Sequence, residues 1–323
     1  MSKVAVIIVN YRTGGLVVDC LRALRSDSVE HVTVVDNASG DGSVERIRDT
    51  IAAEHWADWA ELVAQPHNGG FAAGCNAALA PILVSRHPPD YVLLLNPDTV
   101  PRAGAVRTLA EFLDARPRAG IAGSLLENPD GTPQTSAFRF PTVAGELEHG
   151  ARFGPLSRLL EKMRVSMPIA PEAHSADWVT GASMMIRRSM IDEIGLLDEG
   201  YFLYFEEVDY CRRAARAGWS CWYVPQSRVI HLVSKSTGLD DPLVPRRVPD
   251  YWFASRRRYY AKHHRALETW CASLARAAGF ASWRIRRWLT GQPDIDPPHL
   301  LGDFVRQALL APLVASAGPV SPA

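Results

Sequence analysis

The chain begins with short runs of consecutive aliphatic residues, separated by segments in which apolar residues recur every three or four positions. The runs at residues 4–10, 31–37 and 91–98 are rich in Val, Ile and Leu and become polar only at their ends. Strands of this kind are covered by helices on both faces, as in a parallel sheet. The helical spacing between the runs predicts helices there. This order predicts an α/β fold with a doubly wound, mostly parallel central sheet.

The pattern changes after a helix predicted at residues 105–115. Asn128 to Gly131 reads as a hairpin turn between short apolar stretches. Residues 142–176 contain several prolines and no sustained period, which predicts a mobile loop. A single strand is expected at 177–188. Three acids then mark the start of a helix that ends at Gly218.

The composition becomes basic and aromatic beyond Gly238. From residue 251 to residue 292, nine Lys or Arg residues accompany a single acid, Glu268, which gives a local charge of roughly +8. Three prolines before this segment read as a linker. We therefore predict an α/β domain at 1–240, a basic, aromatic-rich helical extension at 241–311 and a disordered tail at 312–323.

The overall composition restricts the class of protein. Hydrophobic residues make up 47% and charged residues 22% of the chain, and 35 basic residues balance 35 acidic ones, so the net charge does not suggest nucleic acid. Five cysteines without a CxxC pair fit a reducing compartment. The first apolar run is too short for a signal peptide or a membrane span. A cytoplasmic protein is expected.

The tripeptide Asn-Pro-Asp occurs twice, and its two contexts differ. Asp98 follows a predicted central strand, where open α/β sheets bind their ligands. A divalent ion that bridges a diphosphate takes one or two oxygen ligands from the protein, and Asn96 and Asp98 suit that role. Asp130 is followed by Gly131 and belongs to the predicted turn. Context therefore predicts a site at the first copy and a turn at the second.

Asp36 ends the second predicted strand, where dinucleotide-binding folds place the acid that binds a ribose. The first strand is not followed by GxGxxG, and Gly69, Gly70 and Gly74 have another spacing and follow no obvious strand. A dehydrogenase is therefore disfavoured. Asp36 either binds a nucleoside or is an ordinary turn residue.

Glu206, Glu207 and Asp209 lie at the start of a predicted helix, after an aromatic run. Acids in the first turn stabilise a helix, which is one explanation for them. Three acids beside aromatic residues also predict a carboxylate whose pKa is raised toward neutrality, as a general base requires. His231 ends a later strand and is either structural or part of a metal site.

Seven motifs occur in an order that resembles the inverting family 2 glycosyltransferases with the GT-A fold. They are VAVIIVNYR, VVDNASGDGS, NGGFAAGCN, LLLNPD, DWVTGASMMIRR, YFLYFEEVDYCRRAARAGW and VIHLVSKSTG. They are most similar to the rhamnosyltransferase-like branch that acts on polyprenyl-diphosphate-linked sugars. The resemblance covers about residues 3–238.

The resemblance implies a role for each matching residue. It implies that Glu207 is the catalytic base, with Glu206 as the alternative, and that Asp98 and His231 bind Mg²⁺ or Mn²⁺. The implied donor-binding residues are Asn10, Tyr11, Asp36, Asn68, Gly70, Phe71, Gly74, Asn76, Asn96, Lys235 and Ser236. The implied acceptor-binding residues are Trp178, Thr180, Gly181, Ala182 and Asp209.

The resemblance also implies the reaction. A sugar, with L-rhamnose from dTDP-rhamnose as the leading expectation, moves from a nucleotide-diphosphate donor to a saccharide acceptor linked to a polyprenyl diphosphate. Two alternatives stay open. A sugar nucleotidyltransferase would need a glycine-rich, arginine-containing loop after the first strand, for which NYRTGG is a poor match. A non-catalytic, membrane-associated protein that binds nucleotide sugars would keep the fold without turnover.

The basic segment at 251–288 interleaves tryptophans with arginines. Basic aromatic helices bind anionic membrane surfaces, which would place the protein peripherally on the cytoplasmic face of the plasma membrane, near a lipid-linked acceptor. The alternative is that the segment packs against the α/β domain. Nucleic-acid binding is not expected, because no recognised nucleic-acid-binding fold accompanies the charge.

Overall fold

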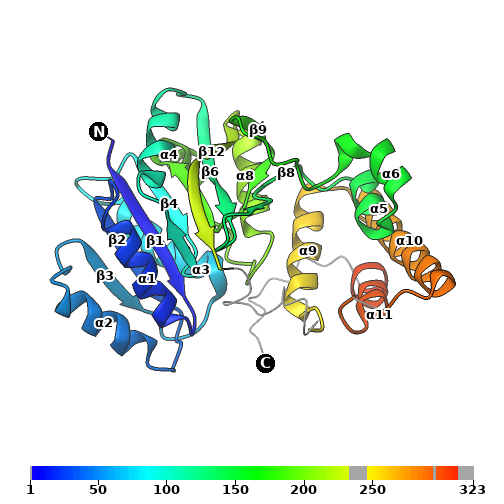
Figure 1. The fold of residues 1–323 in the computed structure, drawn as a ribbon, viewed down its shortest axis with the longest axis horizontal. Coiled ribbons are helices and arrows are strands. Elements are labelled where there is room, and N and C mark those ends of the chain that lie inside the picture. The colour runs from blue at the N-terminus through cyan, green and yellow to red at the C-terminus, as the bar shows by residue number, and fades with distance from the viewer. Residues whose placement is uncertain (1, 233–245, 294–295, 312–323) are drawn as a thin grey trace.

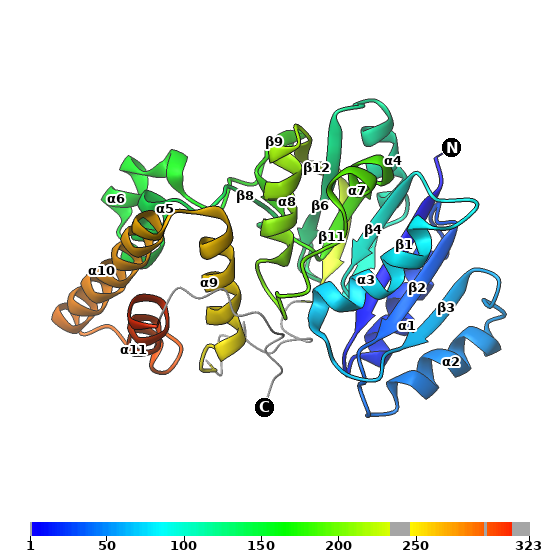
Figure 2. The same ribbon diagram turned by 180° about the vertical axis from the view of Figure 1, so that it is seen from behind.

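The computed structural model describes residues 2–232, 246–293 and 296–311. It consists of a sheet covered by helices on both faces and a lobe of helices beside it (Figure 1). The view from behind shows the same arrangement, with helix α9 between the sheet domain and the rest of the lobe (Figure 2). The α/β fold with a mostly parallel central sheet is confirmed.

The central sheet has ten strands, with the order β3-β2-β1-β4-β11-β6-β12-β5 and with β7 and β9 paired to β6 and β12. β1, β2, β3 and β4 form parallel pairs, β6 and β12 run parallel, and β11 lies antiparallel between β4 and β6. A separate two-stranded sheet joins β8 and β10. The strands are β1 Val4–Asn10, β2 His31–Asp36, β3 Ala60–Ala64, β4 Tyr91–Leu95, β5 Thr99–Pro101, β6 Ala119–Glu127, β7 Pro133–Gln134, β8 Ala137–Phe138, β9 His174–Ala176, β10 Trp178–Val179, β11 Ser183–Arg187 and β12 Ser220–His231.

Alternate residues of the strands contribute to two hydrophobic cores, one on each face of the sheet. Val4, Val6 and Ile8 of β1 pack with α1, α2 and α4. Ile7 and Val9 of the same strand pack with α3, α7 and α8. These helices are α1 Gly14–Leu24, α2 Ser43–Ala53, α3 Gly70–Leu83, α4 Ala105–Asp114, α7 Arg188–Ile194 and α8 Glu206–Arg216.

Three sequence expectations about the sheet need correction. β3 was not expected, because it is a short edge strand with several partly exposed residues. It shows that Gly69 and Gly70 do follow a strand. The strand expected at 91–98 ends at Leu95, and a new strand, β5, begins at Thr99. The strand expected at 177–188 is two strands, because residues 180–182 form a turn between β10 and β11.

The lobe beside the sheet contains helices from two distant parts of the chain. They are α5 Val143–Ala151, α6 Gly154–Leu159, a 3₁₀ turn at Glu161–Met163, α9 Asp250–His263, α10 Ala266–Thr290, α11 Leu300–Phe304 and a π-helical turn at Val305–Leu310. The mobile loop expected at 142–176 is therefore wrong. A Cβ on Gly150 would lie 2.5 Å from the carbonyl oxygen of Arg276, so α5 packs directly against the backbone of α10. This partner lies more than a hundred residues further along the chain.

Candidate active site

A cavity of about 370 Å³ opens at the carboxyl-terminal edge of the parallel strands. Val9 at the end of β1, Asn37 after β2 and Asn96 after β4 line it, and so does the turn before β11. All of these positions lie at the same edge of the sheet, because β11 runs opposite to its neighbours. This is the edge at which open α/β sheets bind their ligands.

Many of the residues singled out from the sequence line this cavity together. They are Tyr11, Asn68, Gly70, Phe71, Asn96, Thr180, Gly181, Ala182, Glu206 and Glu207. They come from five separate segments of the chain, so the fold brings the motifs into one place. Lys235 and Ser236 lie outside the described residues, as does the predicted tail at 312–323.

Asn10 and Asp36 lie beneath the cavity and bond to each other. The Asn10 amide nitrogen donates to the Asp36 carboxylate at 2.6 Å, and the Ser39 hydroxyl donates to the same oxygen at 2.6 Å. The Asn10 amide oxygen accepts from the backbone and side chain of Thr13. Both residues are fully buried. These bonds fix the loops after β1 and β2, and a contact of Asn10 or Asp36 with the donor stays a prediction.

Helix α3 begins at the cavity, and its glycines permit close packing. Gly70 has a φ of +87°, and a Cβ there would lie 2.1 Å from the carbonyl oxygen of Phe202. That oxygen accepts a hydrogen bond from the backbone nitrogen of Phe71 at 2.8 Å. Gly74 packs against Val9, and the Asn76 side chain binds the backbone of Leu197. Gly74 and Asn76 therefore hold α3 in place rather than facing the cavity.

The two residues before α8 have a backbone conformation that residues with side chains rarely adopt. Tyr204 and Phe205 have φ angles of 70° and 69°, in the left-handed region. Such residues cost on the order of 1–3 kcal/mol each and concentrate at functional sites. The resulting turn starts α8 with Glu206 and Glu207, both of which line the cavity.

The carboxylates of Glu206 and Glu207 lie where burial disfavours their charge. Their Oε2 atoms are buried and have no hydrogen-bond partner within the described residues. Burial raises the pKa of Glu207 to about 7. Burial, and to a smaller extent the negative charge of Glu207, raises the pKa of Glu206 well above its ordinary value. Glu207 therefore ionises before Glu206, near neutral pH, as a general base requires.

Asp98 and His231 are brought together next to the cavity. β5 and β12 pair so that Thr99 lies opposite His231, and the backbone carbonyl of Asp98 accepts from the nitrogen of Leu232 at 2.9 Å. The buried Asp98 carboxylate lies 3.5 Å from Nε2 of His231. The two residues are distant in sequence, and the fold brings together the pair that the resemblance implied.

The chemistry of this pair fits a divalent cation that is shared with a diphosphate. Carboxylate oxygen and imidazole nitrogen are both common metal ligands, and a shared cation needs few ligands from the protein. Within the described residues, no group of three or more His, Cys, Asp or Glu side chains is arranged to hold a metal on its own. A cation here would complete its coordination with oxygen atoms of the diphosphate and water.

The second Asn-Pro-Asp copy forms the predicted hairpin. Asp130 lies between β6 and β7, which pair antiparallel, and accepts from the backbone nitrogen and hydroxyl of Thr132 at 2.9 Å and 2.6 Å. It is exposed to solvent. The interpretation of this copy as a turn is confirmed.

Two residues predicted to bind the acceptor do not line the cavity. The Trp178 ring stacks on Phe138 at a centroid distance of 4.1 Å, and its indole nitrogen donates to the carbonyl of Arg139. Asp209 is fully buried one turn into α8, on the side that meets the extension. The structure thus gives Asp209 a different setting from that of Glu206 and Glu207.

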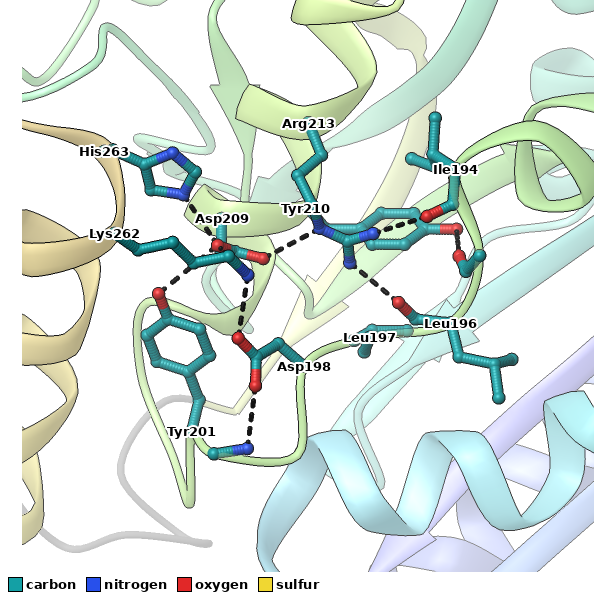
Figure 3. Close-up of polar contacts among 12 residues, drawn as sticks. Ile194, Leu196, Leu197, Asp198, Tyr201, Asp209, Tyr210, Arg213, Lys262 and His263 are labelled. Atoms are coloured by element: carbon teal, nitrogen blue, oxygen red, sulfur yellow. Dashed lines mark hydrogen bonds and ion pairs between the residues drawn. The ribbon is translucent and has the colours of Figure 1, made fainter. Parts of the chain in front are cut away.

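Asp209 is the centre of a polar network that joins α8 to α9 (Figure 3). Its Oδ1 lies 2.6 Å from Nε2 of His263 and 2.8 Å from Nζ of Lys262, and its Oδ2 accepts from Arg213 at 3.0 Å. Lys262 also binds Asp198 at 2.7 Å. Although burial opposes it, hydrogen bonds from His263 and Lys262, together with the cations, hold the pKa of Asp209 well below its usual range.

Arg256 and Arg258 of α9 are engaged inside the protein, which favours the alternative that this helix packs against the rest of the chain. Arg256 is 1% exposed and donates to Glu146 of α5 at 2.9 Å and to Ser273 of α10. Arg258 binds Asp198 at 2.7 Å. The positive charge of this helix is therefore largely balanced by acids of the α/β domain and of α5.

Sequence reasoning missed Tyr251 as a site residue. This tyrosine is in the first turn of α9 and lines the cavity beside Phe202 and Tyr204. Its sequence neighbours gave no signal, since they read only as part of a basic aromatic segment. Asn37 was missed as well, although its place directly after Asp36 at the end of β2 was a signal.

No helix within the described residues combines the length and the apolar character needed to cross a membrane.

Comparisons with known proteins agree with this arrangement. A family model described as glycosyltransferase-like family 2 matches residues 2–260. An N-acetylglucosaminyl-diphospho-decaprenol L-rhamnosyltransferase of Mycobacterium tuberculosis is 33% identical over 153 residues, which are 47% of this chain and 50% of that protein. The rhamnosyltransferase WbbL of Escherichia coli is 26% identical over 164 residues, 50% of this chain and 60% of that protein. The matched segments span only about half of these relatives.

Solved structures share the fold at low identity. A mannosyltransferase of Pyrobaculum calidifontis, in complex with GDP-mannose and Mn²⁺, has a TM-score of 0.55 and 16% identity, covering 95% of this chain and 81% of its own. GalNAc-T7, with UDP, GalNAc and Mn²⁺, has a TM-score of 0.62 and 11% identity, covering 95% of this chain and 56% of its own.

Proposed function

The chain belongs to glycosyltransferase-like family 2, and from this premise we propose that it transfers a sugar from a nucleotide-diphosphate donor to a hydroxyl of a saccharide acceptor. The observation that carries the proposal is the pair of buried Oε2 atoms on Glu206 and Glu207, which lack partners within the described residues and lie at the cavity. Burying carboxylates in this way costs stability. That cost is explained if one of them accepts a proton during catalysis.

Glu207 is the proposed base. As the acceptor hydroxyl oxygen bonds to the anomeric carbon of the donor sugar, its proton passes to the Glu207 carboxylate, and the bond between that carbon and the diphosphate breaks. Glu206 keeps its proton at neutral pH, because burial and the neighbouring charge raise its pKa. A single displacement of this kind inverts the configuration at the anomeric carbon.

Asp98 and His231 are the residues that would hold a divalent cation, and Asn96 lies two residues before Asp98 in the same turn. When bound, Mg²⁺ or Mn²⁺ neutralises negative charge on the departing diphosphate. The donor is expected to lie along the ends of β1, β2 and β4, where the cavity meets this pair.

We propose L-rhamnose from dTDP-rhamnose as the sugar and a polyprenyl-diphosphate-linked saccharide as the acceptor. The names of the relatives from M. tuberculosis and E. coli support the sugar, and the first of them supports the acceptor. The assignment depends on segments that span about half of those proteins. It therefore requires a direct assay.

The test is incubation of the purified chain with dTDP-L-rhamnose, Mg²⁺ or Mn²⁺, and N-acetylglucosaminyl diphosphate that carries a short alkyl chain. We expect a rhamnosylated product by mass spectrometry, one dTDP released per product, and an inverted anomeric centre by NMR. Formation of a nucleotide sugar from a sugar phosphate and a nucleoside triphosphate would indicate a nucleotidyltransferase instead. Binding of dTDP-, UDP- or GDP-sugars without any transfer would indicate a non-catalytic protein.

We also propose that the protein contacts the cytoplasmic face of an anionic membrane, through α10 rather than α9. Leu267, Trp270, Leu274, Ile285 and Trp288 are exposed and recur along one face of this helix. Of the arginines near the last of them, Arg284 is exposed, whereas Arg287 is buried and paired with Asp296. An exposed apolar stripe with tryptophan and a neighbouring arginine is typical of a helix that lies in a membrane interface.

Sedimentation with phosphatidylglycerol vesicles tests the membrane proposal. Binding should weaken as salt increases, because surface attraction decays over a Debye length of about 10 Å at 0.1 M. Replacing Trp270 and Trp288 with Ser should reduce binding and spare turnover of the short-chain acceptor. Equal binding of the wild type and the double variant would contradict the role of α10.

A further inference from the structure

The cavity has an aromatic wall to which the extension contributes. Within the described part of the chain, Tyr251 is the one lining residue that follows β12. Its ring lies 5.4 Å from that of Phe202 and 6.2 Å from that of Tyr204, nearly parallel to the latter at 15°. Phe202 and Tyr204 lie just before Glu206 and Glu207 in sequence, and all three rings line the same cavity as these two acids.

The position of Tyr251 is fixed by contacts between α9 and the loop that precedes α8. The Ser255 hydroxyl donates to the carbonyl of Leu203 at 3.0 Å. Further along the helix, Arg258 binds Asp198. Lys262 and His263 bind Asp209 (Figure 3). A Cβ on Gly200 would meet the guanidinium group of Arg258, so this side chain of α9 packs directly on the loop.

The chemistry of the wall fits one ligand class. A pyranose ring has apolar C–H faces and a rim of hydroxyl groups, so it packs its face on an aromatic ring while polar groups bind its rim. The cavity supplies both, because the aromatic wall adjoins the two carboxylates. A base at Glu207 must reach the acceptor hydroxyl, and the aromatic wall lines the same cavity as this carboxylate, so the wall is well placed for the acceptor sugar.

We propose that Tyr251, with Phe202 and Tyr204, binds the apolar face of the acceptor sugar, so that the C-terminal extension forms part of the acceptor site. This inference rests on the proposed function for the identity of the ligand. It assigns the extension a role in acceptor selection, separate from any contact that α10 makes with a membrane. Changes at this tyrosine should alter acceptor binding and leave donor binding intact.

The experiment compares Tyr251→Ala and Tyr251→Phe with the wild type, and uses Phe153→Ala as the matched control. Phe153 is also an aromatic residue of the helical lobe, but it is 44% exposed at the start of α6 and does not line the cavity. For each protein we would measure the KM for the donor and for short-chain N-acetylglucosaminyl diphosphate, and the binding of that acceptor by calorimetry. Melting temperatures exclude a loss of folding.

Tyr251→Ala should raise the KM and Kd for the acceptor about tenfold, the scale of a lost aromatic contact, with an unchanged donor KM. Tyr251→Phe should stay within about twofold, because it keeps the ring, and Phe153→Ala should match the wild type. Turnover that is indifferent to Tyr251→Ala would overturn the inference and leave the proposed function standing. The same is true of equal changes in donor and acceptor KM.

Calorimetry separates the two proposals if the wild type shows no turnover. Acceptor binding that depends on Tyr251, without transfer, would contradict the proposed function and support the saccharide site. A wild-type protein that does not bind the acceptor probe would overturn the inference as well.

Discussion

Two groups of buried acids lie within one turn of helix α8 and have opposite surroundings. At the cavity, Glu206 and Glu207 have Oε2 atoms without partners in the described chain, and their pKa values are raised. Where α8 packs against α9, Asp209 binds His263, Lys262 and Arg213, and its pKa is lowered. The sequence presents all of these acids alike, as the first turn of a helix.

The difference separates acids that serve the fold from acids that are available for chemistry. A carboxylate surrounded by cations stabilises the folded protein in its charged form and is poorly suited to accept a proton. A buried carboxylate without partners costs stability, and its raised pKa makes it a base near neutral pH. Partners, rather than position in the helix, therefore distinguish the two roles.

The largest effect is expected from Asp98 and His231, the proposed metal-binding pair at the cavity edge. Asp98→Asn should lower turnover roughly a thousandfold, a magnitude typical of losing a group that stabilises transition-state charge. Asp130→Asn is the matched control, since it makes the same change in the same tripeptide in the exposed hairpin. Its turnover should stay within a few-fold of the wild type. Similar losses in both variants, measured at saturating Mn²⁺, would remove the distinction between site and turn.

Next in size is the loss of the proposed base. Glu207→Gln keeps the shape and removes the basicity, so kcat should fall about 10²-fold or more while donor binding survives. Unfolding by urea at pH 8 should show equal or greater stability, since the variant no longer buries a charge. If Glu206→Gln is inactive and Glu207→Gln is active, the base is Glu206.

A smaller effect, on stability rather than on turnover, is expected at Asp209, where α8 packs against α9. Asp209→Asn should lower the free energy of unfolding by about 2–3 kcal/mol, because it leaves His263, Lys262 and Arg213 without their carboxylate. Turnover well below the melting temperature should stay within about threefold of the wild type.

The lowered pKa of Asp209 means that its stabilisation is present at neutral pH and is lost as pH falls below the ordinary value of 3.8. The variant should therefore lose less stability than the wild type on acidification, which urea unfolding at pH 3 and pH 7 would measure.

The sequence predicted the parts of the molecule that depend on local pattern. β1, β2 and β4 were recognisable because burial on both faces gives consecutive aliphatic residues. Asp98 was distinguished from Asp130 by Gly131, which marks the second copy as a turn, since the structure has a buried strand before each copy. The parts that failed depend on distant partners. Helix α5 packs on α10, and Asp209 and Tyr251 acquire their surroundings only when α9 docks on α8. The residues next to these positions in the sequence do not predict any of these contacts.

The pH dependence of kcat/KM tests most directly the central claim, that the base is Glu207, whose Oε2 has no partner among the described residues. The raised pKa of Glu207 leaves the carboxyl protonated and inactive at low pH, so kcat/KM should rise tenfold per pH unit and level off above a pKa of about 7. The residual activity of Glu207→Gln should lack this rise. A wild-type profile that is flat from pH 5.5 to about pH 8.5, or a variant that keeps the same rise, would contradict the account.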